Sequence, residues 1–442
     1  MIDYIKSVFL DALGSVSGKE LVSRALSFQG DSLSVTDRTG ETSVLTLCDF
    51  REIKTVAVGK AAGSMAEGLD NAIGSKIDEG LVITKHGFGE VHHPYKTIFA
   101  AHPVPDESSL SAYEELESLV TGINEEGLLF LLLSGGASSL MCSPAGGVPF
   151  SEKREMIRRL LLTGASINEL NKVRRHLSRG KGGNLLRKFS GKRVVAIALS
   201  DVLGDAHEDI ASGPVSPDPT TFFDAMKVLE TYKIDMKYYP GIRTYWDLGM
   251  DGCVPETVKP DDPLLNKQQY YILANNRDFV TALENRLKQK FNPVHSYTSP
   301  MTGEATVAAI HFSNEMRAHK QESEEYALIA GGETTVTVRG NGKGGRNTEL
   351  CLAMARQLFG LPGFGVLCAA SDGNDGITDA AGAWFNTDTL SKVTTIDEID
   401  HYLHNNDSYT FFEKHDCLIK TGITNTNLND VVVGWGESEF QV

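Results

Sequence analysis

The sequence lacks most of the short patterns that identify common metal and catalytic sites. Its six cysteines form no C-x-x-C pair, and neither H-x-x-x-H nor H-E-x-x-H occurs. Zinc ribbons, thioredoxin-like redox motifs and metalloprotease helices are therefore excluded. G-x-S-x-G and G-x-x-x-x-G-K-[ST] are also missing, which excludes a hydrolase nucleophile elbow and a Walker-type kinase. We expect the thiols to be buried and reduced, as is typical of a cytoplasmic protein.

Basic charge is also scarce. Lys and Arg number 42 against 58 Asp and Glu, which gives a net charge of −16 over 442 residues. Such an acidic surface repels nucleic acid and anionic membranes, and no apolar run reaches the ~18 residues of a membrane span. We therefore expect a cytoplasmic protein, monomer or homodimer, whose partners are small molecules rather than nucleic acid or membrane. An anionic substrate would need a local concentration of cations.

What is present is a repeated rhythm of apolar runs, polar motifs and helical patterns. The runs are "TVAV", "GLVITK", "YKTIFAA", "LLFLLL" and "RVVAIAL". Continuous runs of this kind are typical of strands buried on both faces, and their alternation with helices predicts a three-layer, mostly parallel α/β sheet. The motifs after the runs would then meet at the carboxyl edge of that sheet, where ligands bind in such folds.

The rhythm breaks in the segment 236–262, which is rich in Pro, Gly and Asp. We take this break as a domain boundary and predict an N-terminal domain over residues 1–245 and a second α/β domain over 246–442.

A glycine-rich loop in the second half resembles a dinucleotide fingerprint. Gly340, Gly342 and Gly345 give a literal G-x-G-x-x-G, and a helical pattern follows. The preceding "TTVTVR" alternates polar and apolar residues, unlike the buried first strand of a dinucleotide-binding fold, and "YALIAGGETTVTVRG" reads as two strands. Glycines followed by Arg346 at a helix N-terminus can hold an anion of any kind.

Other polar groups follow the apolar runs. Lys60 closes the first run, and "SGGASS" brings Ser134, Gly135, Gly136, Ala137 and Ser138 to the end of the fourth. Carboxylates at run ends, Asp201 and Asp372, suit Mg²⁺. Each feature alone has a structural explanation: a surface lysine, a tight turn or a turn-forming aspartate. His102 could contact substrate, although a lone histidine is more often structural. Nine Lys and Arg lie in the segment 171–193; we expect most on a solvated helix face and some near the anion site.

Taken together, these stretches resemble the class II glycerate kinases, whose C-terminal half carries a MOFRL domain. The resemblance rests on "VGKAAGSMA", "LLLSGGASSLM", "TGASINELNKVRRHLSRGKGG", "LSDVLGDAHEDIASGPVSPDPTT", "GGETTVTVRGNGKGGRNTEL" and "SDGNDGITDAAGA", spread over most of the chain. Departures from the family pattern are Ala137, Ser139, Ile423 and Asn425.

The resemblance implies an N-terminal three-layer, Rossmann-like domain and a C-terminal MOFRL domain (core about 326–432), with the active site in the cleft between them. It implies ATP- and Mg²⁺-dependent phosphorylation of D-glycerate, giving 2-phosphoglycerate, with Lys60 and Arg346 as catalytic residues. The expected ligand-binding residues are Ser134, Gly135, Gly136, Ala137, Ser138, Glu333, Gly344, Gly345 and Asn347, and the expected metal ligands are Asp201 and Asp372. The alternative is an NAD(P)H-dependent hydroxypyruvate reductase that uses the same glycine loop.

Overall fold

The computed structural model describes residues 1–89, 91 and 94–437, which form two compact units. The first unit is continuous and contains Leu21–Leu273. The second combines the two ends of the chain, Met1–Glu20 and Ala274–Val442. In the described residues, no helix is long and apolar enough to cross a membrane.

A six-stranded sheet forms the centre of the unit Leu21–Leu273. Its strands lie in the order β6-β5-β4-β7-β8-β9, and β6, β5, β4, β7 and β8 are mutually parallel. The five predicted runs are these five strands, so the predicted parallel sheet is confirmed. The bounds are β4 (Ile53–Val58), β5 (Glu79–Lys85), β6 (Tyr95–Ala100), β7 (Leu128–Leu133), β8 (Arg193–Leu199) and β9 (Gln268–Ala274).

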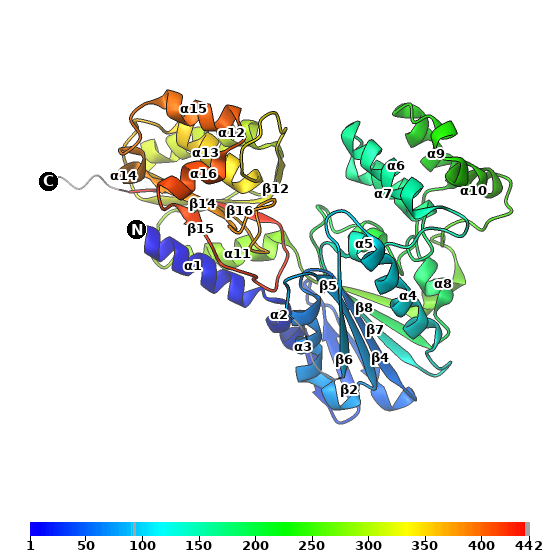
Figure 1. The fold of residues 1–442 in the computed structure, drawn as a ribbon. Helices are drawn as coiled ribbons and strands as arrows, with labels where there is room; N and C mark the ends of the chain where they lie inside the picture. The colour runs from blue at the N-terminus through cyan, green and yellow to red at the C-terminus, as the bar shows by residue number, and fades with distance from the viewer. Residues whose placement is uncertain (90, 92–93, 438–442) are drawn as a thin grey trace. The chain divides into compact units, whose positions relative to one another are not determined.

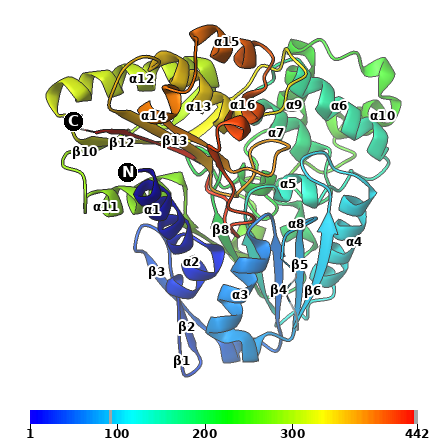
Figure 2. The ribbon, with the colours of Figure 1, turned by 60° about the vertical axis from the view of Figure 1, so that its left-hand side comes forward.

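Helices cover both faces of this sheet (Figure 1). On one face, α4 (Glu107–Thr121) and α8 (Asn184–Lys188) pack Tyr113, Leu116 and Leu186 onto alternate residues of the strands. On the other face, α3 (Ala62–Ile73) contacts β4, β5 and β7. Figure 2 shows α3 and α4 on opposite sides of β4, β5 and β6. The result is the expected three-layer arrangement.

Two further parts of this unit were not predicted. A small antiparallel sheet precedes β4, with strands β1 (Leu26–Gln29), β2 (Ser32–Thr36) and β3 (Thr42–Thr46). Four helices build a separate apolar cluster around the buried Trp246: α6 (Phe150–Leu162), α7 (Ile167–His176), α9 (Phe222–Thr231) and α10 (Pro240–Met250). α7 and α9 begin with side-chain capping boxes at Ser166 and Thr221, which stabilise their first turns.

The predicted boundary between residues 245 and 246 falls within α10. Ile242 and Trp246 are fully buried in the helical cluster, so the Pro- and Gly-rich segment packs as a helix rather than a linker. The compact units divide instead between Leu273 and Ala274 and within α2 (Gly18–Ala25).

The second unit contains a seven-stranded mixed sheet. Its central strands are antiparallel: β12 (Tyr326–Thr335) pairs with β16 (Asp430–Gly436), and β16 pairs with β13 (Phe364–Ala370). β12 is one ten-residue strand, so the interpretation of this stretch as two strands is wrong. The remaining strands are β10 (Val294–Ser296), β11 (Met301–Glu304), β14 (Gly382–Asn386) and β15 (Leu418–Ile419).

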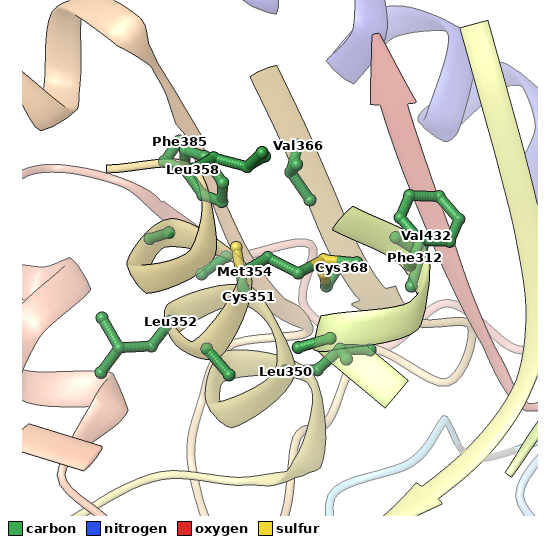
Figure 3. Close-up of a cluster of buried hydrophobic side chains, with 14 of the residues drawn as sticks. Phe312, Leu350, Cys351, Leu352, Met354, Leu358, Val366, Cys368, Phe385 and Val432 are labelled. Atoms are coloured by element: carbon green, nitrogen blue, oxygen red, sulfur yellow. Dashed lines mark hydrogen bonds between the residues drawn. The ribbon is translucent and has the colours of Figure 1, made fainter. Parts of the chain in front are cut away.

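Helices cover this sheet on two faces. One face packs α12 (Ala305–Glu322) and α13 (Arg346–Gln357) in an apolar core where Met354 and Phe312 meet Val366, Cys368 and Val432 (Figure 3). α11 (Asn276–Leu287) packs on β12 and also on α1 (Ile2–Ser15), through Phe9 and Phe279 among others. Three short helices complete the unit: α14 (Thr387–Leu390), α15 (Ile396–His404) and α16 (Ser408–Lys414).

Candidate functional site

Two hydrogen bonds connect the turn that follows β4 to the turn that follows β7. The Lys60 N–H donates to the Gly135 carbonyl at 3.0 Å, and the Ala61 N–H donates to Ser134 Oγ at 3.0 Å. Gly59 has φ +132°, and a Cβ there would lie 2.2 Å from Ser134 Oγ, so only glycine permits this approach. The structure therefore brings Lys60 together with the serine–glycine turn, as the positions of both at parallel strand ends predicted.

Gly136 marks the point where three strand ends meet. It has φ +90° and begins the short helix α5 (Ala137–Leu140). A Cβ at this position would lie 3.2 Å from His102 Nε2 and 3.5 Å from Lys60 Cγ. The lysine side chain and the imidazole, which follow β4 and β6, thus lie over the same glycine after β7. A cation and a group that can exchange a proton are available here to one small ligand.

Ser138 leads to residues that sequence reasoning missed. Its Oγ lies 2.7 Å from Ser212 Oγ, which donates to Asn171 Oδ1 at 3.2 Å. Ala211 and Ser212 have φ values of +55° and +59°, a conformation that costs energy in non-glycine residues and often occurs at functional sites. No sequence pattern signals left-handed backbone in "IAS", so this part of the site could not be predicted.

The basic segment 171–193 is mostly not a solvated helix face. Of its nine cations only Arg187 and Lys192 are exposed. Several of the others bond to aspartates or to backbone carbonyls within the unit. Buried Arg175 contacts Asp209 at 3.1 Å and Asp218 at 3.2 Å. Buried Lys181 donates to the Ser138 carbonyl at 2.6 Å. The expectation for most of these residues is therefore wrong, whereas some do adjoin the candidate anion site.

The two predicted metal ligands belong to different units. Asp201 follows β8 near Tyr270, whose pKa is raised by burial and by this aspartate. Asp372 follows β13, is 5% exposed and accepts the Asn374 N–H at 2.9 Å. Within the described part of the chain, no group of three or more His, Cys, Asp or Glu is arranged to hold a metal ion. Single carboxylates remain compatible with Mg²⁺, which commonly takes one or two together with substrate phosphates.

Two carboxylates fix Arg346 at the start of α13. Its guanidinium forms a two-pronged pair with Asp430, with Nη2 to Oδ1 at 3.0 Å, and Nη1 contacts Glu333 at 2.7 Å. Burial alone would lower the pKa of Arg346, but Asp430 and Glu333 outweigh it and raise the pKa. The arginine is thus permanently charged and has one orientation.

The first turn of α13 is capped by the chain itself. The Asp375 carboxylate accepts the N–H groups of Asn347 at 2.9 Å and Thr348 at 2.8 Å. A Cβ at Gly345 would lie 2.4 Å from Asp375 Cγ. We expected these amides to face an anionic ligand; instead a buried carboxylate, whose pKa burial raises to about 6, occupies the helix N-terminus.

The glycine loop before α13 is packed against residues 405–408. A Cβ at Gly340 or Gly342 would lie 2.3 Å from Asn405 O or Asp407 Cβ. The Gly340 N–H donates to Asn406 Oδ1 at 3.0 Å, and the Lys343 N–H donates to Asp407 Oδ1 at 2.8 Å. These glycines serve close packing of the loop, a role that the literal G-x-G-x-x-G pattern does not reveal.

Comparisons with known proteins agree over nearly the whole chain. The family model DUF4147, described as a domain of unknown function, matches residues 4–247, and the MOFRL family model matches residues 326–430. "D-glycerate 2-kinase" of Thermotoga maritima is 39% identical over 86% of this chain and 89% of its own length. "Glycerate 2-kinase" of Pyrococcus horikoshii is 34% identical over 86% of this chain and 87% of its own. The crystal structure of glycerate kinase from Thermotoga maritima superposes with a TM-score of 0.81 and 34% identity, covering 98% of this chain and 99% of that one.

Proposed function

The chain belongs to the MOFRL family of glycerate kinases, and we propose that it transfers the γ-phosphoryl group of ATP to D-glycerate, giving 2-phosphoglycerate. The observation that carries this proposal is the convergence of Lys60 and His102 over Gly136, at the carboxyl edge of the parallel sheet. This edge is where ligands bind in α/β folds, and phosphoryl transfer requires chiefly positioning and charge neutralisation from a protein.

Residues of the first unit bind and orient a ligand in this scheme. The Lys60 ammonium neutralises one anionic group, and the turn of Ser134, Gly135, Gly136, Ala137 and Ser138 holds it in place. Lys60 is positioned by its own amide, which is bonded to Gly135. His102, over the same glycine, contacts the same ligand.

Arg346 stabilises negative charge on the transferred group. Glu333 and Asp430 fix the plane of the guanidinium by pairing with Nε, Nη2 and Nη1. A guanidinium has five N–H donors, so two N–H groups beyond these three contacts can point to the transferred group. Gly344, Gly345 and Asn347 support this arrangement by letting the helix start pack on Asp375.

Asp201 and Asp372 are the candidate ligands of Mg²⁺, since carboxylate oxygens are its preferred protein donors. Mg²⁺ held by these carboxylates would supply positive charge that offsets the negative charge of the phosphates. We place the enzyme in the cytoplasm, because all six cysteines are free thiols and free thiols persist in reducing compartments. We propose a monomer or a homodimer as its assembly.

Product analysis tests the proposal. We expect ³¹P NMR of the protein with D-glycerate and MgATP to give the resonances of ADP and 2-phosphoglycerate. The same preparation with hydroxypyruvate and NADH should leave the nicotinamide absorbance unchanged. Oxidation of NADH without ADP formation would instead identify the reductase alternative, which the self-capped N-terminus of α13 argues against. Binding without turnover in either assay would mean a non-catalytic protein.

A further inference from the structure

The unit Leu21–Leu273 contains a basic pocket to which the proposed reaction assigns no role. This cavity of about 170 Å³ lies between α6, the segment 103–105 and the segment 138–142. Among the described residues, Glu155 is the one carboxylate in its lining. Five lining residues are cations: Lys153, Arg154, Arg158, Arg174 and Lys181. We call this cavity the basic pocket.

The innermost cations have neutral partners. Lys153 is 3% exposed, and its Nζ donates to the carbonyls of Ser143 at 3.0 Å and Leu177 at 2.8 Å. Lys181 is 2% exposed and donates to the Ser138 carbonyl. An ammonium group has three N–H donors, so both lysines keep donor capacity beyond these bonds.

Arg174 also has a neutral partner, because its Nη1 donates to the amide oxygen of Asn171 at 3.4 Å. In the portion of the chain that the structure describes, Lys153, Arg174 and Lys181 have no carboxylate within ion-pair distance. Burial lowers the pKa of Lys153 to about 8 and that of Arg174 to about 10. Burial also lowers the pKa of Lys181. Buried charges are ordinarily paired, and a bound anion would favour the charged form of both lysines.

The charge of the pocket selects the class of anion. Glu155 is already held by Arg158 through two bonds of 2.8 Å, which leaves four cations for a ligand. A single carboxylate such as that of glycerate would leave most of this charge uncompensated. The walls also include Val104, Ile157 and Leu161. Val104 and Leu161 are more than half exposed, so a ligand can enter the pocket from solvent.

We propose that the basic pocket binds a polyphosphate group of two or more linked phosphates. The pocket shares the Ser134–Leu140 region with Lys60, because the Ser138 carbonyl that receives Lys181 belongs to it. The polyphosphate comes either from the nucleotide, in which case the inference rests on the proposed kinase function, or from a free polyphosphate ligand.

Calorimetric titration of the full chain with sodium tripolyphosphate, without Mg²⁺, tests the proposal. We expect one site per chain, an affinity that falls as NaCl is raised, and at least tenfold weaker binding by Lys181→Met. Arg158→Gln should weaken binding severalfold, because it leaves the Glu155 carboxylate unpaired in the pocket, where it repels an anion. The Arg158 side chain is 61% exposed, so this variant folds even if Lys181→Met does not. The matched control is Arg159→Gln, on the same helix but outside the pocket lining, which should bind like the wild type.

Absence of binding by the wild type, or equal affinity in the wild type, Arg158→Gln and Lys181→Met, would overturn the proposal. Competition then identifies the source of the ligand. Displacement of tripolyphosphate by ATP but not by adenosine assigns the pocket to the nucleotide, whereas binding that ATP does not displace assigns it to a free polyphosphate. Glycerate turnover by a wild type that binds no tripolyphosphate would reject the pocket and keep the kinase proposal.

Discussion

At the scale of single residues, Arg346 is the predicted catalytic side chain whose charge and orientation are fixed by its neighbours. Asp430 and Glu333 hold it charged and oriented. We expect Arg346→Ala to lower kcat by ~10³-fold, the size of effect seen when an arginine that stabilises the transferred group is lost. KM should change much less, because the lost contact acts mainly in the transition state. Steady-state kinetics with D-glycerate and MgATP provides the measurement.

Arg356→Ala is the matched control for this experiment. Arg356 lies in the same helix and also pairs with a carboxylate, Asp400, but at a 41% exposed position. Its removal should leave kcat unchanged. An Arg346→Ala enzyme with normal kcat would remove the residue from the mechanism.

Glu349 provides a pH-dependent test at the same scale. Burial raises its pKa from 4.5 to about 7, and the nearby Glu304 and Asp375 act in the same direction. The folded state thus favours the protonated form, so its stabilising effect is full below pH 4.5 and is lost as pH rises through 7. The free energy of unfolding should fall by up to about 3 kcal/mol from this group between pH 4.5 and 8.

Denaturant unfolding of Glu349→Gln at several pH values measures this effect. The glutamine cannot ionise and still accepts from Asn406, which now donates to Glu349 Oε1 at 3.3 Å. We expect a flatter pH profile and a gain in stability at pH 8. Glu315→Gln, at an exposed position of α12, should retain the wild-type profile; if Glu349→Gln does too, Glu349 is ionised in the folded protein.

Part of the candidate site was predictable from residue positions. Lys60 and Ser134 both follow buried parallel strands, and parallel topology alone brings such ends to one edge. Ser212 and Lys181 reach the same turn from irregular segments. Their placement depends on long-range contacts that no local pattern encodes.

At the scale of elements, the turn between β7 and α5 can be tested with glycine substitutions. Gly136→Ala places a methyl group 3.1 Å from the His102 ring and near Lys60, at φ +90°. We expect kcat/KM to fall at least tenfold, because both side chains must move. Kinetics and thermal unfolding should be measured together.

Gly147→Ala is the control that separates the effect of backbone strain from the displacement of His102 and Lys60. Gly147 has φ +82° with nothing within 4 Å of an added Cβ. Both variants should lose about 1 kcal/mol of stability, but Gly147→Ala should keep its activity. Equal activity of the two would show that the side chains over Gly136 do not take part.

Periodicity identified the five buried strands because their runs are continuous and β-branched or aliphatic. It failed at β12, where an apolar half joins an alternating half through Gly331 and Gly332 in a single strand. The capped start of α13 was equally hidden, because Asp375 lies 28 residues after Asn347.

At the scale of the whole molecule, the N-terminal helix belongs with the C-terminal unit. Ile5, Phe9 and Leu13 of α1 are buried, and Tyr4 donates to the Arg286 carbonyl of α11 at 3.0 Å. Deletion of residues 1–15 should therefore destabilise the second unit, since each large apolar side chain contributes roughly 1.5–3 kcal/mol on burial. Hydrogen exchange should show lost protection in α11 and β12, with β4, β7 and β8 unchanged. Equal loss in both units would contradict this division.

The amphipathic pattern of α1 was visible in the sequence, but its partner was not. A hydrophobic stripe indicates that a helix packs, not against which element. Similarly, the Pro, Gly and Asp content of 236–262 suggested a domain boundary, although Ile242 and Trp246 anchor a helix there. The division into domains depends on tertiary contacts. Amino-acid composition can indicate a boundary only where the segment between the domains is exposed to solvent.

The split construction of the second unit has a consequence for synthesis on the ribosome. Residues 1–20 leave the ribosome before the segment that receives α1, which begins only at Ala274. At translation rates of roughly 5–20 residues per second, the apolar stripe of α1 waits on the order of 10–50 s for its binding surface. During that interval the apolar face of α1 is uncovered, although the unit Leu21–Leu273 can already fold. Ribosome-associated chaperones that shield apolar segments are therefore expected to bind α1 until the segment from Ala274 onward has been synthesised.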